Sequence, residues 1–130
     1  MCIRDSNSSD QSTGTITPGS WTHVAITINS GVTNGSTFFI DGAASGTGTY
    51  TITSDDGPLY IGRYYDSPTY GGWWPGEMDE VAIFNTALSA DKIQQIYNAT
   101  AVVGGVPQTA NLFTGGLDSS LVYWNRMGDS

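Results

Sequence analysis

Residues 21–42 read WTHVAITINSGVTNGSTFFIDG, and this stretch decides the fold. Every second residue from Val24 to Ile28 is a large aliphatic, which is the period of a strand with one buried face. The glycines of 31–35 predict a turn, and the apolar run 37–40 predicts a second strand. Asp41-Gly42 follows, a pair that tolerates positive φ at both positions of a tight hairpin turn. The stretch therefore predicts antiparallel strands joined by short turns.

The same pattern of short strands and turns continues along the chain. We expect strands over Trp21 to Ile28, Thr37 to Ile40, Tyr50 to Thr53, Leu59 to Gly62 and Glu77 to Phe84. Acidic residues before Gly57-Pro58 break the third of these from the fourth. Short strands at this spacing are typical of a sandwich or jelly roll.

One helix is expected, from Ser89 to Tyr97. Ser89 is a good N-cap, and Asp91 lies in the first turn, where the helix dipole favours a negative charge. Ile93, Ile96 and Tyr97 form a one-sided apolar stripe. Because so short a helix is unstable alone, it must pack on the strands.

Size and composition exclude several classes of function. The 130 residues suffice for one core, and 12 acidic against 4 basic residues give a net charge of −8. That charge repels nucleic acid and anionic membranes, and no apolar run approaches the roughly 20 residues of a membrane helix. The lone Cys2 excludes an internal disulfide, and the lone His23 leaves no partner for a histidine-rich metal site. A binding module, a structural module and a carboxylate-based enzyme remain.

The two ends differ from the middle of the chain. Residues 1–10 begin MCIRDS, which resembles a translated adapter at the end of a metagenomic reading frame; a short disordered natural leader is the alternative. Residues 11–98 are interpreted as the module, and the Gly/Pro-containing residues 99–110 as a linker. Residues 111–130 are too short to fold alone, so they either dock on the module or open a further domain. We interpret the chain as an internal fragment of a larger protein.

Five motifs, in order, resemble the laminin G-like, concanavalin A-like jelly rolls, a superfamily related to the pentraxins. Trp21 to Ala25 resembles the family's W-x-H-V-A strand, and Phe39 to Gly42 and Leu59 to Gly62 resemble its Y-V-D-G hairpin and L-x-I-G strand. Gly76 to Asn85 is similar to G-x-I-D-E-V-R-I-Y-N. Ala87 to Tyr97 is similar to A-L-S-x-x-E-I-x-x-L-Y.

The resemblance implies an all-β, antiparallel jelly-roll sandwich with one short helix near the C-terminal third. In the family several strands precede the W-x-H-V-A strand, so the resemblance also implies an N-terminally truncated fragment. We therefore expect apolar faces and strand edges that are open to solvent.

The segment 60–74 is the richest candidate site, because it holds six of the fifteen aromatic residues among glycines and a proline. Aromatic faces on the loops of such sandwiches commonly stack on sugar rings. The expected ligand-binding residues are Tyr64, Tyr65, Tyr70, Trp73 and Trp74. The alternative is that Trp73 and Trp74 plug one end of the core. Adjacent residues of an extended chain point opposite ways, so we expect the two to differ, with Trp74 the more buried.

Asp66 is the candidate metal ligand, and calcium is the candidate cofactor. Asp66 and Ser67 resemble the end of the calcium-binding Q-E-Q-D-S segment of the pentraxins, whereas Arg63, Tyr64 and Tyr65 replace its other ligands. Calcium takes six to eight oxygens, so Asp66 is expected to bind it in the intact parent rather than in this chain.

Glu77-Met78-Asp79-Glu80 stands close to the E-x-D-x-E motif of some jelly-roll glycoside hydrolases. A retaining enzyme needs two carboxyl groups about 5–5.5 Å apart, hence positions i and i+4 of one strand. Val81 occupies the i+4 position, so no catalytic residue is predicted, and Asp79 and Glu80 are expected to bond neighbouring loops. His23 is expected to be structural, since no nucleophile is marked beside it.

These observations predict a non-catalytic extracellular binding or adhesion module that recognises carbohydrate or another surface ligand. We expect it to be part of a larger secreted or virion protein, at a cell surface or virion, without nucleic-acid partners or membrane insertion. The alternatives are a structural spacer or protein-adhesion module without a small ligand, and, more remotely, a glycoside hydrolase fragment.

Overall fold

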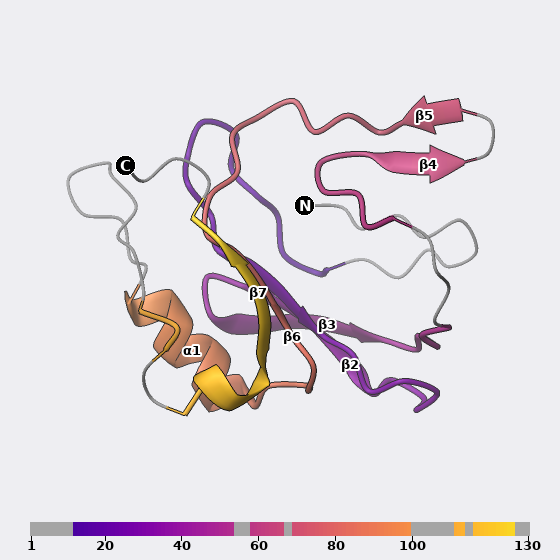
Figure 1. Cartoon of the computed structure of the whole chain (residues 1–130). Coiled ribbons are helices and arrows are strands. Elements are labelled where there is room, and N and C mark those ends of the chain that lie inside the picture. Colours follow the sequence, from indigo (N-terminus) through magenta and orange to yellow (C-terminus); the bar gives the residue numbers. More distant parts are fainter. Residues whose placement is uncertain (1–11, 54–57, 67–68, 100–110, 114–115, 127–130) are drawn as a thin grey trace.

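The computed structural model describes residues 12–53, 58–66, 69–99, 111–113 and 116–126. Its elements are β1 (Val24–Thr27), β2 (Ser36–Ile40), β3 (Ala43–Gly48), β4 (Tyr64–Asp66), β5 (Thr69–Gly71), β6 (Val81–Phe84), α1 (Ala90–Ala99), a 3₁₀ turn (Asp118–Ser120) and β7 (Leu121–Asn125) (Figure 1). All described strand pairs are antiparallel. The predicted fold class, an antiparallel all-β sandwich fragment with one short helix, is confirmed.

β1, β2 and β3 form one sheet in that order. The β2–β3 hairpin turns at Asp41 and Gly42, which take φ of 48° and 75°, so Ile40 pairs directly with Ala43. This is the two-residue turn that Asp-Gly predicts, because positive φ at both turn residues gives the turn a backbone twist that matches the right-handed twist of the flanking strands. A register shift between Thr37 and Phe39 then bends the sheet.

The core has two centres. On β2, the adjacent Phe38 and Phe39 are both buried. Neighbours in a strand point to opposite faces, so both faces of this sheet are covered. The second centre joins the buried Leu112 and Leu117 to half-buried residues of β6, α1 and β7, among them Phe84 and Trp124.

Helix α1 begins where the sequence predicts. The Ser89 hydroxyl accepts a hydrogen bond from the Lys92 backbone N–H at 3.4 Å, and the Ser89 carbonyl accepts from Ile93 at 3.1 Å. Ile93 is buried, and the Tyr97 ring lies against His23, with 5.8 Å between centroids. The helix therefore packs on the sheet through the predicted apolar stripe.

The segment beyond residue 110 returns to the module. β7 pairs with β6, with Val81 opposite Asn125 and Phe84 opposite Leu121. The register shifts within this pair, so Val122 is an extra residue in β7. Figure 1 shows β7 lying along β6 near α1.

Several predicted strand limits are wrong. Tyr50 to Thr53 forms no strand, because its backbone bonds a turn instead: the Tyr50 carbonyl accepts from Gly31, and Ile52 donates to the Ser30 hydroxyl. Leu59 to Gly62 is also not a strand. The predicted strand from Glu77 starts only at Val81, because Glu80 takes a φ of 53° and interrupts the extended chain.

Several large apolar side chains of the described residues are exposed. They are Trp21, Val24, Val32, Ile52, Leu59, Ile61, Trp73, Trp74, Phe113, Val122 and Tyr123. Single exposed apolar residues are ordinary on a protein surface, whereas contiguous exposed patches are typical of interaction surfaces.

Candidate functional site

A small hairpin carries the aromatic segment. β4 and β5 pair with Tyr64 opposite Gly71, Tyr65 opposite Tyr70 and Asp66 opposite Thr69. Sequence reasoning predicted a loop here. The hairpin forms here because tyrosine favours strands. In Figure 1 this hairpin lies at the end of the molecule opposite α1.

The two ends of the hairpin are tied together. Gly62, at a φ of 77°, turns the chain into β4, and its carbonyl accepts a 2.8 Å hydrogen bond from the Trp74 backbone N–H. A side chain at position 62 would lie 2.8 Å from the Met78 methyl carbon. The positive φ is what favours glycine here, because the Met78 methyl is the end of a flexible side chain and could move aside.

Arg63 links the hairpin to aromatic rings on either side of it. Its guanidinium carbon lies 4.8 Å from the centroid of the Tyr60 ring and 5.5 Å from the centroid of the Trp73 ring. Both distances are within the reach of a cation–π interaction. The sequence analysis considered Arg63 only as a residue that stands in place of a calcium ligand, and missed this role. The signal that could have indicated the cation–π contacts is an arginine flanked in sequence by aromatic residues.

Trp73 and Trp74 are the predicted site residues whose side chains are described. Trp73 is 65% exposed and Trp74 is 37% exposed, so the expectation that Trp74 is the more buried is confirmed. The Trp74 indole N–H donates to the Glu77 carbonyl at 3.3 Å. Neither indole is buried, so neither fills the core.

The remaining predicted site residues are placed by their backbone alone. Tyr64, Tyr65 and Tyr70 lie in the hairpin, and Asp66 ends β4. Their side chains, and Ser67 altogether, lie outside the described part of the chain. Among the described residues, no three His, Cys, Asp or Glu side chains gather to hold a metal ion.

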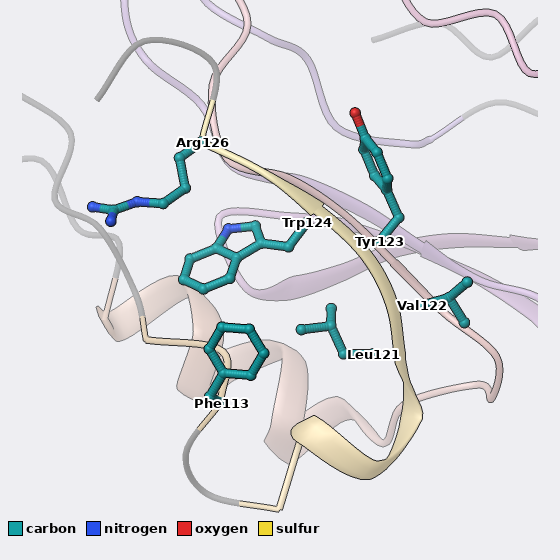
Figure 2. Close-up of a pocket in the computed structure, with 6 residues that line it drawn as sticks. All are labelled: Phe113, Leu121, Val122, Tyr123, Trp124 and Arg126. Atoms are coloured by element: carbon teal, nitrogen blue, oxygen red, sulfur yellow. The ribbon is translucent and has the colours of Figure 1, made fainter. Parts of the chain in front are cut away.

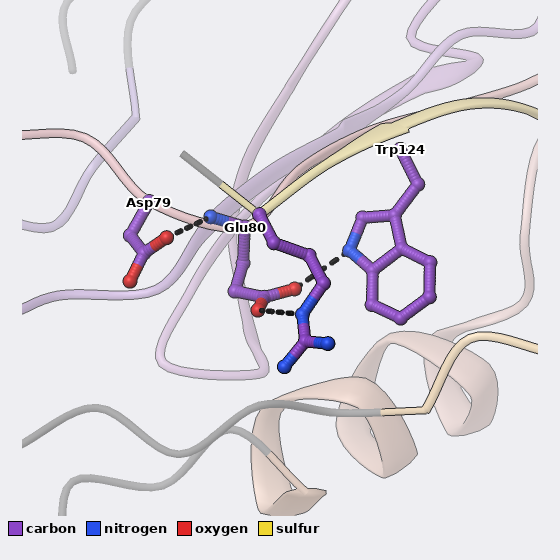
Figure 3. Close-up of polar contacts among 4 residues, drawn as sticks. Asp79, Glu80 and Trp124 are labelled. Atoms are coloured by element: carbon purple, nitrogen blue, oxygen red, sulfur yellow. Dashed lines mark hydrogen bonds and ion pairs between the residues drawn. The ribbon is translucent and has the colours of Figure 1, made fainter. Parts of the chain in front are cut away.

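The acidic segment binds strand β7 (Figure 3). The Trp124 indole N–H donates to Glu80 Oε2 at 2.6 Å, and Arg126 Nε lies 3.7 Å from Glu80 Oε1. Asp79 Oδ1 accepts from the backbone N–H of Glu80 at 2.9 Å. The sequence predicted bonds from both residues to neighbouring loops. Glu80 instead bonds strand β7, and Asp79 bonds the backbone of the next residue.

Beside Glu80, a hollow of about 440 Å³ follows β7 (Figure 2). The Phe113 and Trp124 rings meet edge to face, with 5.4 Å between centroids, and Arg126 lies over Trp124 at 5.7 Å. The hollow is lined mainly by consecutive residues of one strand, and side chains of both faces border it. It therefore runs along the edge of β7 rather than into the core. Sequence reasoning assigned no role to these residues.

His23 joins the sheet to the hairpin turn. Its backbone N–H donates to Asp41 Oδ1 at 3.0 Å, and the Asp41 N–H donates to the His23 carbonyl at 2.8 Å. Burial lowers the pKa of His23 below its usual value of 6.5, and the Asp41 carboxylate opposes that shift. The environment is that of a packed, neutral imidazole.

Comparisons with known proteins bear on the fold and the family of the chain. A crystal structure of part of an S-layer domain-containing protein from Clostridium thermocellum is similar to this chain, with 29% identity and a TM-score of 0.55. The match covers 66% of this chain and 43% of that one, so this chain spans less than half of that structure. No curated protein matches the chain. Within the described residues, no helix is long and apolar enough to span a membrane.

A family model matches residues 4–94, which is more than half of the chain. That range contains the β1–β3 sheet, the aromatic hairpin, β6 and the first half of α1. The model describes the concanavalin A-like lectin/glucanases superfamily. The chain belongs to this superfamily, as a laminin G-like domain.

Proposed function

We propose that this chain is a non-catalytic glycan-binding module of a larger surface protein, and that it binds sugar through the aromatic segment 60–74. The observation that carries the proposal is the exposure of Trp73, whose indole is 65% accessible beside the stacked guanidinium of Arg63. An exposed indole offers a broad apolar face with little side-chain freedom to lose on binding. Sugar rings present matching C–H faces.

The proposal of no catalysis rests on the acidic segment. Retaining hydrolysis needs two carboxyl groups about 5–5.5 Å apart, with room for substrate between them. Glu80 is 14% exposed and is engaged by Trp124 and Arg126. Its neighbour Asp79 is engaged with the Glu80 backbone. These contacts fit a structural role, in which Glu80 links β6 to β7, better than the role of a catalytic acid or base.

The proposed setting is the outside of a cell or virion. Support comes from the similarity to an S-layer domain-containing protein and from the acidic, charge-poor composition. Calcium through Asp66 stays a prediction that requires oxygen ligands from elsewhere in the parent protein or from the glycan.

A glycan array tests the proposal, with the chain assayed in calcium and again in a chelator. Trp73→Ala should lose binding about tenfold or more while its unfolding midpoint stays unchanged, because the exposed ring contributes little to the core.

Trp74→Ala should lower stability by about 1–3 kcal/mol, less than the loss of a fully buried Trp, because the indole is half covered and bonded to Glu77. If the chain without substitutions binds no glycan in either condition, the proposal is wrong.

A second candidate is a protein-adhesion or spacer module without a small ligand. It is favoured by the exposed apolar side chains away from the aromatic segment, such as Val32, Ile52 and Val122. Such surfaces suit packing between modules. An unchanged glycan array for Trp73→Ala, together with self-association that Val32→Ser or Ile52→Ser abolishes, would favour this candidate.

A further inference from the structure

Arg63 lies at a point where two distant parts of the segment meet. Tyr60 precedes β4, Trp73 follows β5, and the Arg63 guanidinium lies over both rings, at 4.8 Å and 5.5 Å. The backbone hydrogen bond from the Trp74 N–H to the Gly62 carbonyl joins the same two segments, at the residues next to Trp73 and Arg63. Two interactions therefore hold the base of the hairpin together: a backbone hydrogen bond and the cation–π contacts of Arg63.

The stack has a consequence for the Trp73 ring. An indole that is 65% exposed has little packing to select one rotamer. A guanidinium over one part of the ring, itself held over Tyr60, supplies that selection. Its planar, delocalised cation can cover two rings at once, which a compact ammonium does less well.

We propose that Arg63 is a positioning residue, which holds the Trp73 ring outward as a platform for a neutral sugar ring. This inference rests on the proposed glycan binding and names the ligand class and the residue that prepares the site. In it, Arg63 acts through Trp73 and does not itself bind the sugar.

The charge of the sequence favours a neutral ligand. Between residues 58 and 80 the sequence carries Asp66, Glu77 and Asp79 against the single cation Arg63, while Glu80 in the same range is paired with Arg126. The whole chain carries −8. A uronic-acid polymer would meet this field over many sugar units, and one arginine whose faces lie against aromatic rings offsets little of it. A neutral glycan meets no such repulsion.

The test uses Arg63→Met, which keeps the aliphatic stem and removes the planar charge. Arg126→Met is the matched control, because it removes a similar arginine–tryptophan contact outside the segment 60–74. The first readout needs no ligand: near-ultraviolet circular dichroism, with the parent minus Trp73→Ala spectrum defining the Trp73 signal. A ring held in one orientation gives a signal and a freely rotating ring gives almost none.

We expect Arg63→Met to lose most of the Trp73 signal and Arg126→Met to keep it. The second readout is affinity for neutral β-glucan, xylan and galactan oligosaccharides, with polygalacturonate as the acidic comparison. Arg63→Met should bind the neutral ligand about 3- to 10-fold more weakly, with Arg63→Lys intermediate, whereas Arg126→Met should bind it like the parent. Polygalacturonate should not bind the parent.

Each contrary outcome is distinct. Loss of affinity with an unchanged Trp73 signal would make Arg63 a direct ligand contact and overturn the positioning role. Preference for polygalacturonate would overturn the neutral ligand class. If no glycan binds, the proposed function fails, and the dichroism alone then judges whether Arg63 positions Trp73. Should Arg63→Met not fold, Arg63→Lys carries both readouts, and a lysine variant identical to the parent would overturn the role of the planar guanidinium.

Discussion

At the scale of single residues, several of the chain's few charged side chains make specific contacts with tryptophan rings. The two described arginines, Arg63 and Arg126, each lie over a tryptophan ring. Glu80 accepts the Trp124 indole N–H while holding a backbone φ of 53°. A non-glycine residue in that region costs about 1–3 kcal/mol, so its surroundings must hold it there.

Glu80 is expected to stabilise the pairing of β7 with β6 through its hydrogen bond to Trp124. Glu80→Ala removes a charge-assisted hydrogen bond and should cost about 1.5–3 kcal/mol, while Glu80→Gln keeps an acceptor and should cost less. Urea unfolding measures both, and a cycle with Trp124→Phe should give a coupling energy of at least about 0.5 kcal/mol. The exposed Glu77→Gln is the control, and additive losses in the cycle would contradict this stabilising role.

His23 should make stability depend on pH. Burial depresses its pKa in the folded state below 6.5. Well above that pH the imidazole is neutral in both states and carries no penalty. As the pH falls through 6.5, the unfolded chain takes up the proton first, so the free energy of unfolding falls. Urea unfolding at about pH 7.5 and about pH 5.5 should show a larger loss for the parent than for His23→Gln. Equal losses would assign the pH dependence to other groups.

At the scale of elements, the β2–β3 turn is where sheet and helix meet. A Cβ at Gly42 would lie 2.8 Å from the Gln94 side chain and 2.9 Å from the Tyr97 ring, at a φ of +75°. Gly31 has nearly the same φ, +76°, with nothing within 4 Å. Gly31→Ala therefore measures backbone strain alone, about 1–2 kcal/mol, and Gly42→Ala should cost more by the clash with α1. Equal midpoints for the two variants would mean that the turn does not pack on the helix.

The sequence predicted elements well where local chemistry decides them. The Asp41-Gly42 turn and the Ser89 cap need only their own backbone, and both are present. Strand limits depended on distant partners. The small, Gly-rich β3 forms because β2 offers it a ladder, whereas Tyr50 and Ile52 bond the turn near Ser30 instead.

The candidate site was predictable to the same extent. Clustered aromatics indicated the segment 60–74, and the period of an extended chain indicated that Trp74 is the more buried. No local pattern places Arg63 over two rings, because that contact needs the hairpin to bring Trp73 back to Tyr60. Nor does a pattern in β7 reveal Glu80 as its partner, 44 residues away.

At the scale of the whole molecule, the folded unit extends past the family match. That match ends at residue 94, yet the buried Leu112 and Leu117 and the strand β7 all lie beyond it. β7 covers one edge of β6, and the two leucines join Phe84 of β6 to the helix face that carries Ile96. The segment therefore completes a core that the matched residues begin.

Removing residues 111–130 should consequently unfold the module rather than trim it. Loss of a buried leucine costs about 2–5 kcal/mol, and two are lost together with a strand pairing, against a total stability of about 5–15 kcal/mol for a typical domain. We expect the shortened chain to lose its cooperative urea transition and to bind a hydrophobic dye, while a chain that ends at residue 126 keeps the parent's midpoint. The double variant Leu112→Ala/Leu117→Ala tests the same core without shortening the chain and should lower the midpoint in the same direction. A shortened chain that unfolds cooperatively at the parent's midpoint would show that the matched residues hold a complete core of their own.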